Sequence, residues 1–112
     1  MATIEWEDFT RVELCVGTIL TAEELPEARR PAYKLTIDFG PDIGVKKSSA
    51  QITDLYETES LIGKQVIAVI NFPPKQIGRF MSECLITGFH RRDGKVVLAR
   101  PDGEVHNGAR LA

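Results

Sequence analysis

The chain has 112 residues, of which 43% are hydrophobic and 27% are charged, and this composition predicts one globular domain over residues 1–112. The N-terminus lacks a basic, apolar leader and no apolar run approaches about 18 residues, which excludes a signal peptide and a membrane-spanning helix and predicts a cytoplasmic protein. The net charge of −2 argues against nucleic-acid binding, but seven of the eight charged residues in 1–28 are acidic, which leaves a basic face open in the remainder.

The first elements expected along the chain are a short helix and a long strand. Thr3 is a suitable N-cap and acidic residues follow it, so we expect a helix over residues 3–10. From Val12 the residues alternate between two faces, which indicates a strand. Gly17 interrupts this strand, and a glycine at such a position usually marks a bulge or a sharp bend.

Two further strands and a second helix come next. Residues 33–39 alternate most regularly, and residues 45–49 form a third expected strand. A second short helix is expected over residues 53–61, with its cap at Thr53 or Asp54. The inward-facing positions of the second strand are Tyr33, Leu35, Ile37 and Phe39.

The last part of the chain adds a central strand and two more strands. Residues 65–70 are apolar on both faces, as in a buried strand, and residues 81–89 and 95–99 continue the sheet. The order predicts an all-β fold, a five-stranded Greek-key OB-fold barrel (oligonucleotide/oligosaccharide-binding type) with one short N-terminal helix and one between strands three and four. A β-sandwich or an SH3-like barrel would produce a similar pattern.

The segment after the central strand is the first candidate binding site. Two consecutive prolines fix the backbone there and remove two hydrogen-bond donors, so the segment is expected to be stiff and unable to pair as a strand. Its apolar side chains would line a peptide-binding groove, although Phe72 and Phe80 could instead plug the open end of the barrel as core residues. The expected groove residues are Phe72, Pro73, Pro74, Ile77, Phe80 and Met81.

A polar and basic rim would accompany this groove. Its side chains could hydrogen-bond a peptide main chain or contact the phosphates of tRNA, since barrels of this type bind polymers on one face. The alternative is that these charges form an ordinary solvated surface, and that Ser49 serves the connection into the helix. The expected rim residues are Arg30, Lys34, Lys46, Lys47, Ser49, Gln51, Lys75 and Arg79.

The remaining chemistry-bearing residues argue against catalysis. Cys15 and Cys84 lie in apolar strands and are expected to be buried free thiols. His90 and His106 stand alone, without the spacing of a metal site, and no catalytic triad, carboxylate pair or phosphate-binding glycine loop is present. The sequence therefore predicts a protein without enzyme activity, metal or cofactor.

The N-terminal apolar residues Ile4, Trp6 and Phe9 would either plug a barrel end or contact a second subunit.

Several motifs in chain order resemble the tRNA-binding domain family, which includes the domain appended to methionyl-tRNA synthetases. They are FTRVELCVGTILTAEELPEA, YKLTIDFG, KKSSAQIT, QVIAVINFPP, GRFMSECLITG and LARPDGEVHNGARL, and the match runs from about Phe9 to Leu111. Within the family the chain is most similar to stand-alone CsaA-type export chaperones. Synthetase-type domains tend to read NL-x-P where this chain has NFPP, and SG where it has Ser48-Ser49, and these departures favour a peptide ligand.

The resemblance implies an OB-type barrel, a homodimer, and a role in holding unfolded precursor proteins for secretion, with a component of the export machinery as a further partner. Together with the apolar proline segment, it predicts an ATP-independent chaperone that binds unfolded precursors or peptides. The alternative is a structure-specific tRNA-binding protein. A third interpretation is an interaction domain that docks on a synthetase or on the export machinery.

Overall fold

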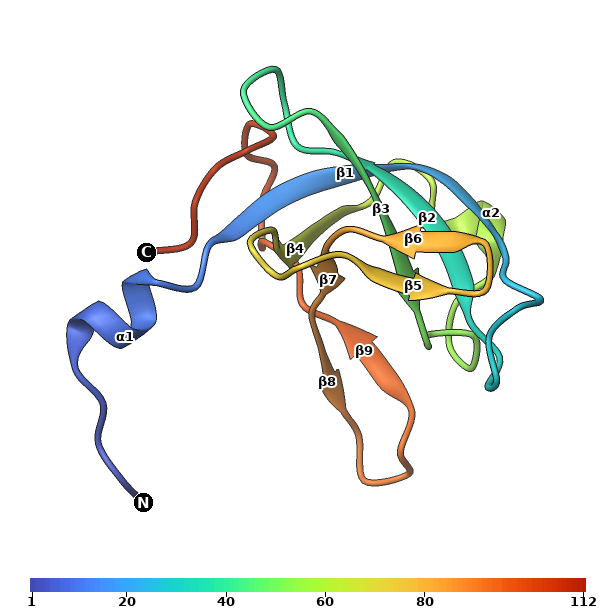
Figure 1. Ribbon diagram of the computed structural model, residues 1–112, viewed down its shortest axis with the longest axis horizontal. Coiled ribbons are helices and arrows are strands. Elements are labelled where there is room, and N and C mark those ends of the chain that lie inside the picture. The colour runs from blue at the N-terminus through green and yellow to red at the C-terminus, as the bar shows by residue number, and fades with distance from the viewer.

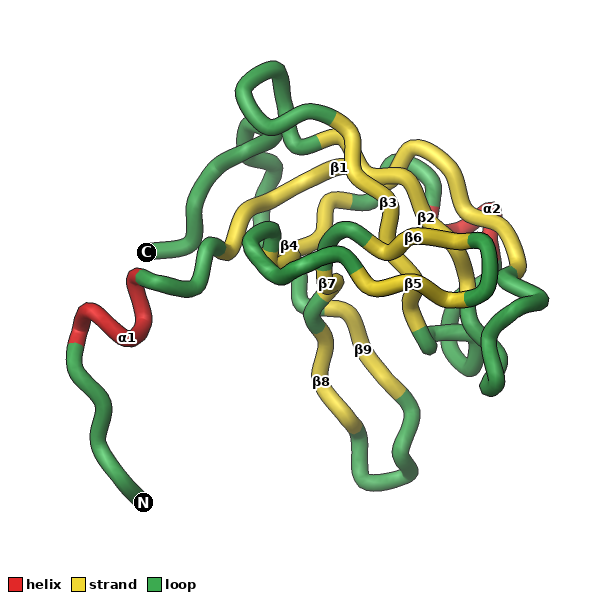
Figure 2. The backbone as a smooth tube through the Cα atoms, in the orientation of Figure 1, coloured by secondary structure: helices red, strands yellow, loops and turns green.

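The computed structural model describes residues 1–112 and contains a five-stranded antiparallel sheet in the order β3-β2-β1-β4-β7, two small hairpins and two short helices (Figures 1 and 2). No helix in it has the length and apolar character needed to cross a membrane. The sheet strands are β1 (Leu14–Glu24), β2 (Tyr33–Asp38), β3 (Val45–Ala50), β4 (Gln65–Val69) and β7 (Leu85–Ile86). The hairpin strands and helices are β5 (Lys75–Ile77), β6 (Phe80–Ser82), β8 (Gly88–His90), β9 (Val96–Leu98), α1 (Trp6–Thr10) and α2 (Thr58–Leu61).

The first strand bends and belongs to both halves of the barrel. Its first part pairs with β4 and its second part pairs with β2. The register shifts between Ile19 and Thr21, so the bulge expected at Gly17 lies a few residues later. Gly17 has a different role, because a Cβ atom there would lie 2.6 Å from Cγ2 of Ile37. The glycine lets β1 pass close to the side chains of β2.

The edge strand β3 forms hydrogen bonds with the segment between β6 and β7, and these bonds curl the sheet into a nearly closed barrel. The Lys47 backbone N–H donates to Oε1 of Glu83 at 2.9 Å, and the Glu83 N–H donates to the Lys47 carbonyl at 2.7 Å. The Ser48 hydroxyl donates to the Cys84 carbonyl at 3.0 Å from a buried position. The predicted all-β, OB-type barrel is therefore confirmed.

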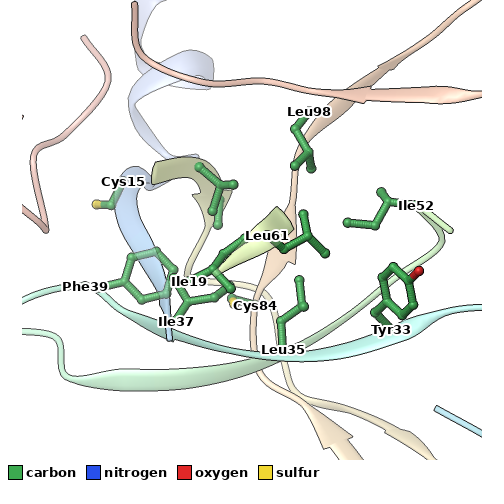
Figure 3. Close-up of a cluster of buried hydrophobic side chains, with 12 residues drawn as sticks. Cys15, Ile19, Tyr33, Leu35, Ile37, Phe39, Ile52, Leu61, Cys84 and Leu98 are labelled. Atoms are coloured by element: carbon green, nitrogen blue, oxygen red, sulfur yellow. The ribbon is translucent and has the colours of Figure 1, made fainter. Parts of the chain in front are cut away.

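The core lies inside this barrel, where side chains of β1, β2, α2 and β4 meet (Figure 3). Every inward-facing residue predicted for the second strand is buried. Cys15 and Cys84 are also buried in this cluster as free thiols, as predicted. The alternation of apolar and polar residues predicted the orientation of the β2 side chains correctly, because one face of that strand is buried. The core residues are Cys15, Ile19, Tyr33, Leu35, Ile37, Phe39, Ile52, Leu61, Val66, Ala68, Cys84 and Leu98.

Both helices are shorter than predicted. The first covers Trp6–Thr10, and Glu5 rather than Thr3 is its N-cap, in a reciprocal capping box with Asp8. The second covers only Thr58–Leu61, although residues 53–61 were expected to be helical. The carbonyl of Tyr56 accepts a hydrogen bond from the Tyr33 hydroxyl at 2.8 Å instead of taking part in a helix.

The predicted strand over residues 81–89 is broken into β6, β7 and β8. The breaks follow from changes of partner along the segment: β6 pairs with β5, β7 pairs with β4, and β8 pairs with β9. A strand that changes neighbours twice cannot stay regular. The C-terminal segment also pairs with β1. The Val16 N–H donates to the Ala109 carbonyl at 2.9 Å, and the Gly108 and Leu111 N–H groups donate to the carbonyls of Val16 and Leu14 at 2.7 and 2.8 Å.

Candidate functional site

Asn71 follows β4 and fixes the start of the apolar proline segment, residues 72–81. The Asn71 side chain donates to the Arg11 carbonyl at 2.8 Å and accepts from the Glu13 N–H at 3.0 Å. These two bonds tie the segment to the entry of β1. Sequence reasoning missed this role; the available signal was an amide side chain placed between an apolar strand and two prolines.

Phe72 is not a core residue. The residue is 52% exposed, and Pro73 and Pro74 after it are also exposed. Phe72 borders a hollow of about 380 Å³ in which its apolar neighbours are Val12 and Val69. Of the two interpretations of Phe72, as a barrel plug or as a side chain facing outward, the structure supports the second. The complete lining of this hollow is Asp8, Arg11, Val12, Val69, Asn71 and Phe72.

The expectation that the proline segment cannot pair as a strand is wrong from Lys75 onward. Lys75 follows the second proline, has a free N–H group, and begins the hairpin of β5 and β6, in which Ile77 pairs with Phe80. The hairpin turns at Gly78, whose φ of 60° suits a glycine at the first position of a two-residue turn. The prolines therefore stiffen the approach to a paired hairpin and do not lie in a long open loop.

The apolar residues of this hairpin are less accessible than Phe72. Ile77, Phe80 and Met81 are half-buried. The Lys47 ammonium of β3 lies 5.6 Å from the centre of the Phe80 ring, within the range of a cation–π contact. The six predicted groove residues thus separate: Phe72 and the prolines face outward beside the first hollow, whereas the hairpin residues lie against β3.

A second hollow, of about 590 Å³, lies between the connection that precedes β2 and the β5–β6 hairpin; we call it the basic cleft. Three predicted rim residues, Arg30, Gln51 and Lys75, come together there. In Figure 1 the turn of this hairpin lies beside the loop between β1 and β2. The full lining is Glu27, Ala28, Arg29, Arg30, Gln51, Lys75, Gln76, Ile77 and Gly78.

Three other rim residues share the outer face of β2 and β3. Lys34 lies opposite Ser49 in the register, Thr36 lies opposite Lys47, and residues two apart on a strand share a face. The Lys34 ammonium also lies 3.6 Å from a carboxylate oxygen of Glu23. These residues continue the polar surface from the cleft across the sheet.

The last two rim residues lie apart from that face. Lys46 pairs with the buried Ile37, so it belongs to the opposite face of β3 and does not join the other rim lysines. Arg79 is exposed in the turn of the β5–β6 hairpin, next to Gly78.

The two cysteine thiols are buried in the core rather than exposed at a site. Burial raises the pKa of the Cys84 thiol from 9.0 to about 11, so it is protonated at neutral pH and is a weak nucleophile. Burial also raises the pKa of Cys15. No group of three or more His, Cys, Asp or Glu residues is placed to hold a metal ion.

The sheet order and the nearly closed barrel define a small protein of the OB type. The chain belongs to the tRNA-binding domain family, because residues 14–110 match the family model described as "Putative tRNA binding domain". It is 33% identical over 106 residues to the methionine–tRNA ligase of Flavobacterium johnsoniae. That match covers 95% of this chain but only 14% of the ligase, so the chain spans a small part of such relatives.

Two solved structures of chaperones resemble the whole chain. The chaperone CsaA of Bacillus anthracis is 49% identical, with a TM-score of 0.92, and the match covers 99% of this chain and 100% of that one. The CsaA chaperone of Picrophilus torridus is 48% identical, also with a TM-score of 0.92, and the match covers 98% of this chain and 100% of that one. The chain is therefore a member of the tRNA-binding domain family that resembles CsaA chaperones over nearly all of its length.

Proposed function

We propose that this protein is a chaperone without enzyme activity that holds unfolded precursor polypeptides for export, without ATP, and passes them to a component of the export machinery. Such a protein would meet its precursors in the cytoplasm. The observation that carries the proposal is the half-exposed Phe72 on a stiff proline segment, in a chain 49% identical to a CsaA chaperone. A side chain presented on rigid backbone loses little conformational entropy when a ligand covers it.

The proposed peptide site has two parts. Phe72, Pro73 and Pro74 would supply the exposed apolar contacts beside the first hollow. Ile77, Phe80 and Met81 would contribute once the Lys47 side chain moves from the Phe80 ring. The polar rim would hydrogen-bond the peptide main chain. Its residues are those that lie around the cleft or on the outer face of β2 and β3, namely Arg30, Lys34, Lys47, Ser49, Gln51 and Lys75.

The energetics of peptide binding favour more than one site. Burying one large apolar side chain is worth about 1.5–3 kcal/mol. Micromolar affinity requires about 8 kcal/mol after the cost of association. One exposed phenylalanine is therefore insufficient, and either several anchors on one chain or two linked sites are needed.

A homodimer would supply the second site, and helix α1 is the proposed contact. α1 projects from the barrel in Figure 1 and has no buried residue, so it does not plug the barrel end. Trp6 is 66% exposed and packs on Phe9 with ring centroids 5.5 Å apart. Beside them an apolar hollow of about 260 Å³ reaches Leu111. Two copies of this surface would cover each other in a symmetric interface.

The second candidate function is tRNA binding. It is favoured by the family match and by the three cations, Arg29, Arg30 and Lys75, in the basic cleft. Phosphate contacts make such binding strongly dependent on salt: a protein with about 6–10 phosphate contacts loses about three to five orders of magnitude in affinity between 50 and 200 mM salt. Capture of a peptide by apolar contacts changes far less.

The test compares wild-type protein with Phe72→Ser for binding of a fluorescent, unfolded apolar precursor peptide. Ile62→Ser is the matched control, because Ile62 is 55% exposed and follows α2, outside both hollows. We expect Phe72→Ser to weaken peptide binding about tenfold or more, and Ile62→Ser to change it less than twofold. Equal peptide affinity for wild-type protein and Phe72→Ser would show that the peptide site lies elsewhere.

A further inference from the structure

The basic cleft contains one carboxylate, that of Glu27, among the cations Arg29, Arg30 and Lys75. The ion pairs of the structure join Lys34 with Glu23, Arg91 with Asp93, and Arg110 with Glu13. Glu27 takes part in none of them, and its side chain is exposed. The cleft therefore presents an acidic group that none of its own cations neutralises by direct contact.

The backbone around Glu27 keeps this residue in the lining of the cleft. Pro26 and Pro31 stiffen the connection, and its two ends are joined by a hydrogen bond of 3.0 Å from the Leu25 N–H to the Ala32 carbonyl. Such a short, closed loop limits the movement of its own backbone. The position of Glu27 is thus a property of the loop rather than of a flexible chain end.

The hairpin turn on the other side of the cleft packs directly on Glu27. A Cβ atom at Gly78 would lie 2.6 Å from Cβ and 2.8 Å from Cγ of Glu27. Only glycine fits at this point, both because of that contact and because its φ is 60°. The two loops therefore meet at Glu27 and Gly78, and both residues line the basic cleft beside its cations.

We propose that Glu27 is a selectivity residue, which disfavours phosphate backbones in the basic cleft and leaves it open to uncharged polypeptide. This inference rests on the proposed function, because it takes the cleft as part of the ligand-binding face. A phosphate that approaches the three cations also approaches Glu27 and is repelled by it. A peptide main chain has no net charge, so it binds Gln51 and Gln76 without this repulsion.

The experiment measures tRNA affinity and neutral-peptide affinity for wild-type protein and Glu27→Gln by fluorescence anisotropy, at about 50 and about 200 mM salt. We expect Glu27→Gln to tighten tRNA binding about three- to tenfold at the lower salt concentration. The gain should shrink at the higher concentration, because the Debye length falls from above 10 Å to below about 8 Å. Affinity for the neutral peptide should change less than twofold.

Two further variants separate the failure of this inference from that of the proposed function. Glu104→Gln makes the same change of net charge at an exposed residue outside the basic cleft, in a polar hollow with Arg100 and Asp102. Lys75→Gln removes a cation from the cleft itself. The selectivity role is overturned if Glu27→Gln and Glu104→Gln change tRNA affinity equally, or if neither protein binds tRNA. If Lys75→Gln and Phe72→Ser also leave both ligands unaffected, the proposed binding face is wrong as well.

Discussion

Lys47 and Glu83 close the barrel through two hydrogen bonds, one from each backbone N–H group: the Lys47 N–H donates to the Glu83 carboxylate at 2.9 Å, and the Glu83 N–H donates to the Lys47 carbonyl at 2.7 Å. The edge strand β3 is thereby fixed to the segment between β6 and β7. Lys47 also belongs to the proposed binding face, because its ammonium lies over the Phe80 ring.

We predict that Glu83→Ala destabilises the protein by about 1–3 kcal/mol, because the Lys47 N–H loses its acceptor. Urea denaturation followed by circular dichroism measures this change as a lower midpoint at constant slope. Glu83→Gln keeps an acceptor oxygen and should retain most of the stability. Equal midpoints for Glu83→Ala and wild-type protein would mean that the seam does not contribute to folding.

Gly17→Ala should destabilise the barrel by overpacking its core. The added Cβ would lie 2.6 Å from Cγ2 of Ile37 and 2.7 Å from Cδ1 of Phe39. Both neighbours are fully buried and have little room to move, so we expect a loss of about 1–3 kcal/mol. Gly103→Ala is the control, since a Cβ there meets no atom within 4 Å. Thermal unfolding of both variants is the measurement, and similar melting temperatures would contradict the prediction.

Cys84 should make stability fall at alkaline pH. Burial raises the pKa of its thiol from 9.0 to about 11, so the folded state keeps the proton where the unfolded state loses it. The resulting stabilisation is complete below pH 9.0 and is lost between pH 9.0 and about 11, by about 1.4 kcal/mol per pH unit. The measurement is the difference in unfolding free energy between wild-type protein and Cys84→Ala across this range. A constant difference would refute the assignment.

Trp6→Ser should convert the proposed homodimer to a monomer. Trp6 is exposed on α1 and contacts only Phe9 among the aromatic residues, so its loss removes interface area without disturbing the core. Sedimentation equilibrium of wild-type protein, Trp6→Ser and Ile62→Ser gives the molecular mass of each. We expect about twice the chain mass for wild-type protein and Ile62→Ser, and one chain mass for Trp6→Ser. A wild-type protein of one chain mass would remove the dimer from the proposal.

Local patterns in the sequence were sufficient for much of the barrel. The alternation from Tyr33 to Phe39 placed β2 correctly, and the apolar run at residues 65–70 placed β4. Both strands are regular because each of them pairs with β1 along its full length. The strands within residues 81–89 were harder to predict, because that segment changes its partner strand twice. The alternation of side chains within one segment does not indicate which strand pairs with it.

The candidate site was predicted only in its parts. The proline segment and most basic residues were recognised as surface candidates, and Arg30, Gln51 and Lys75 do lie around one cleft. The contact between Glu27 and Gly78 was missed because it joins two loops that are distant in the sequence and carry no motif. The separation of Phe72 from the hairpin residues was missed for the same reason.

The sequence by itself determined the all-β architecture, the buried thiols and the stiffness of the segment at Pro73 and Pro74, because each of these depends on side-chain chemistry and on neighbours a few residues away. Only the tertiary structure decided that Phe72 faces solvent, that Lys47 covers Phe80, and that an acid lies among the cations of the cleft. Those relationships arise when the curled sheet brings separate loops together, and barrel closure is a property of the whole chain.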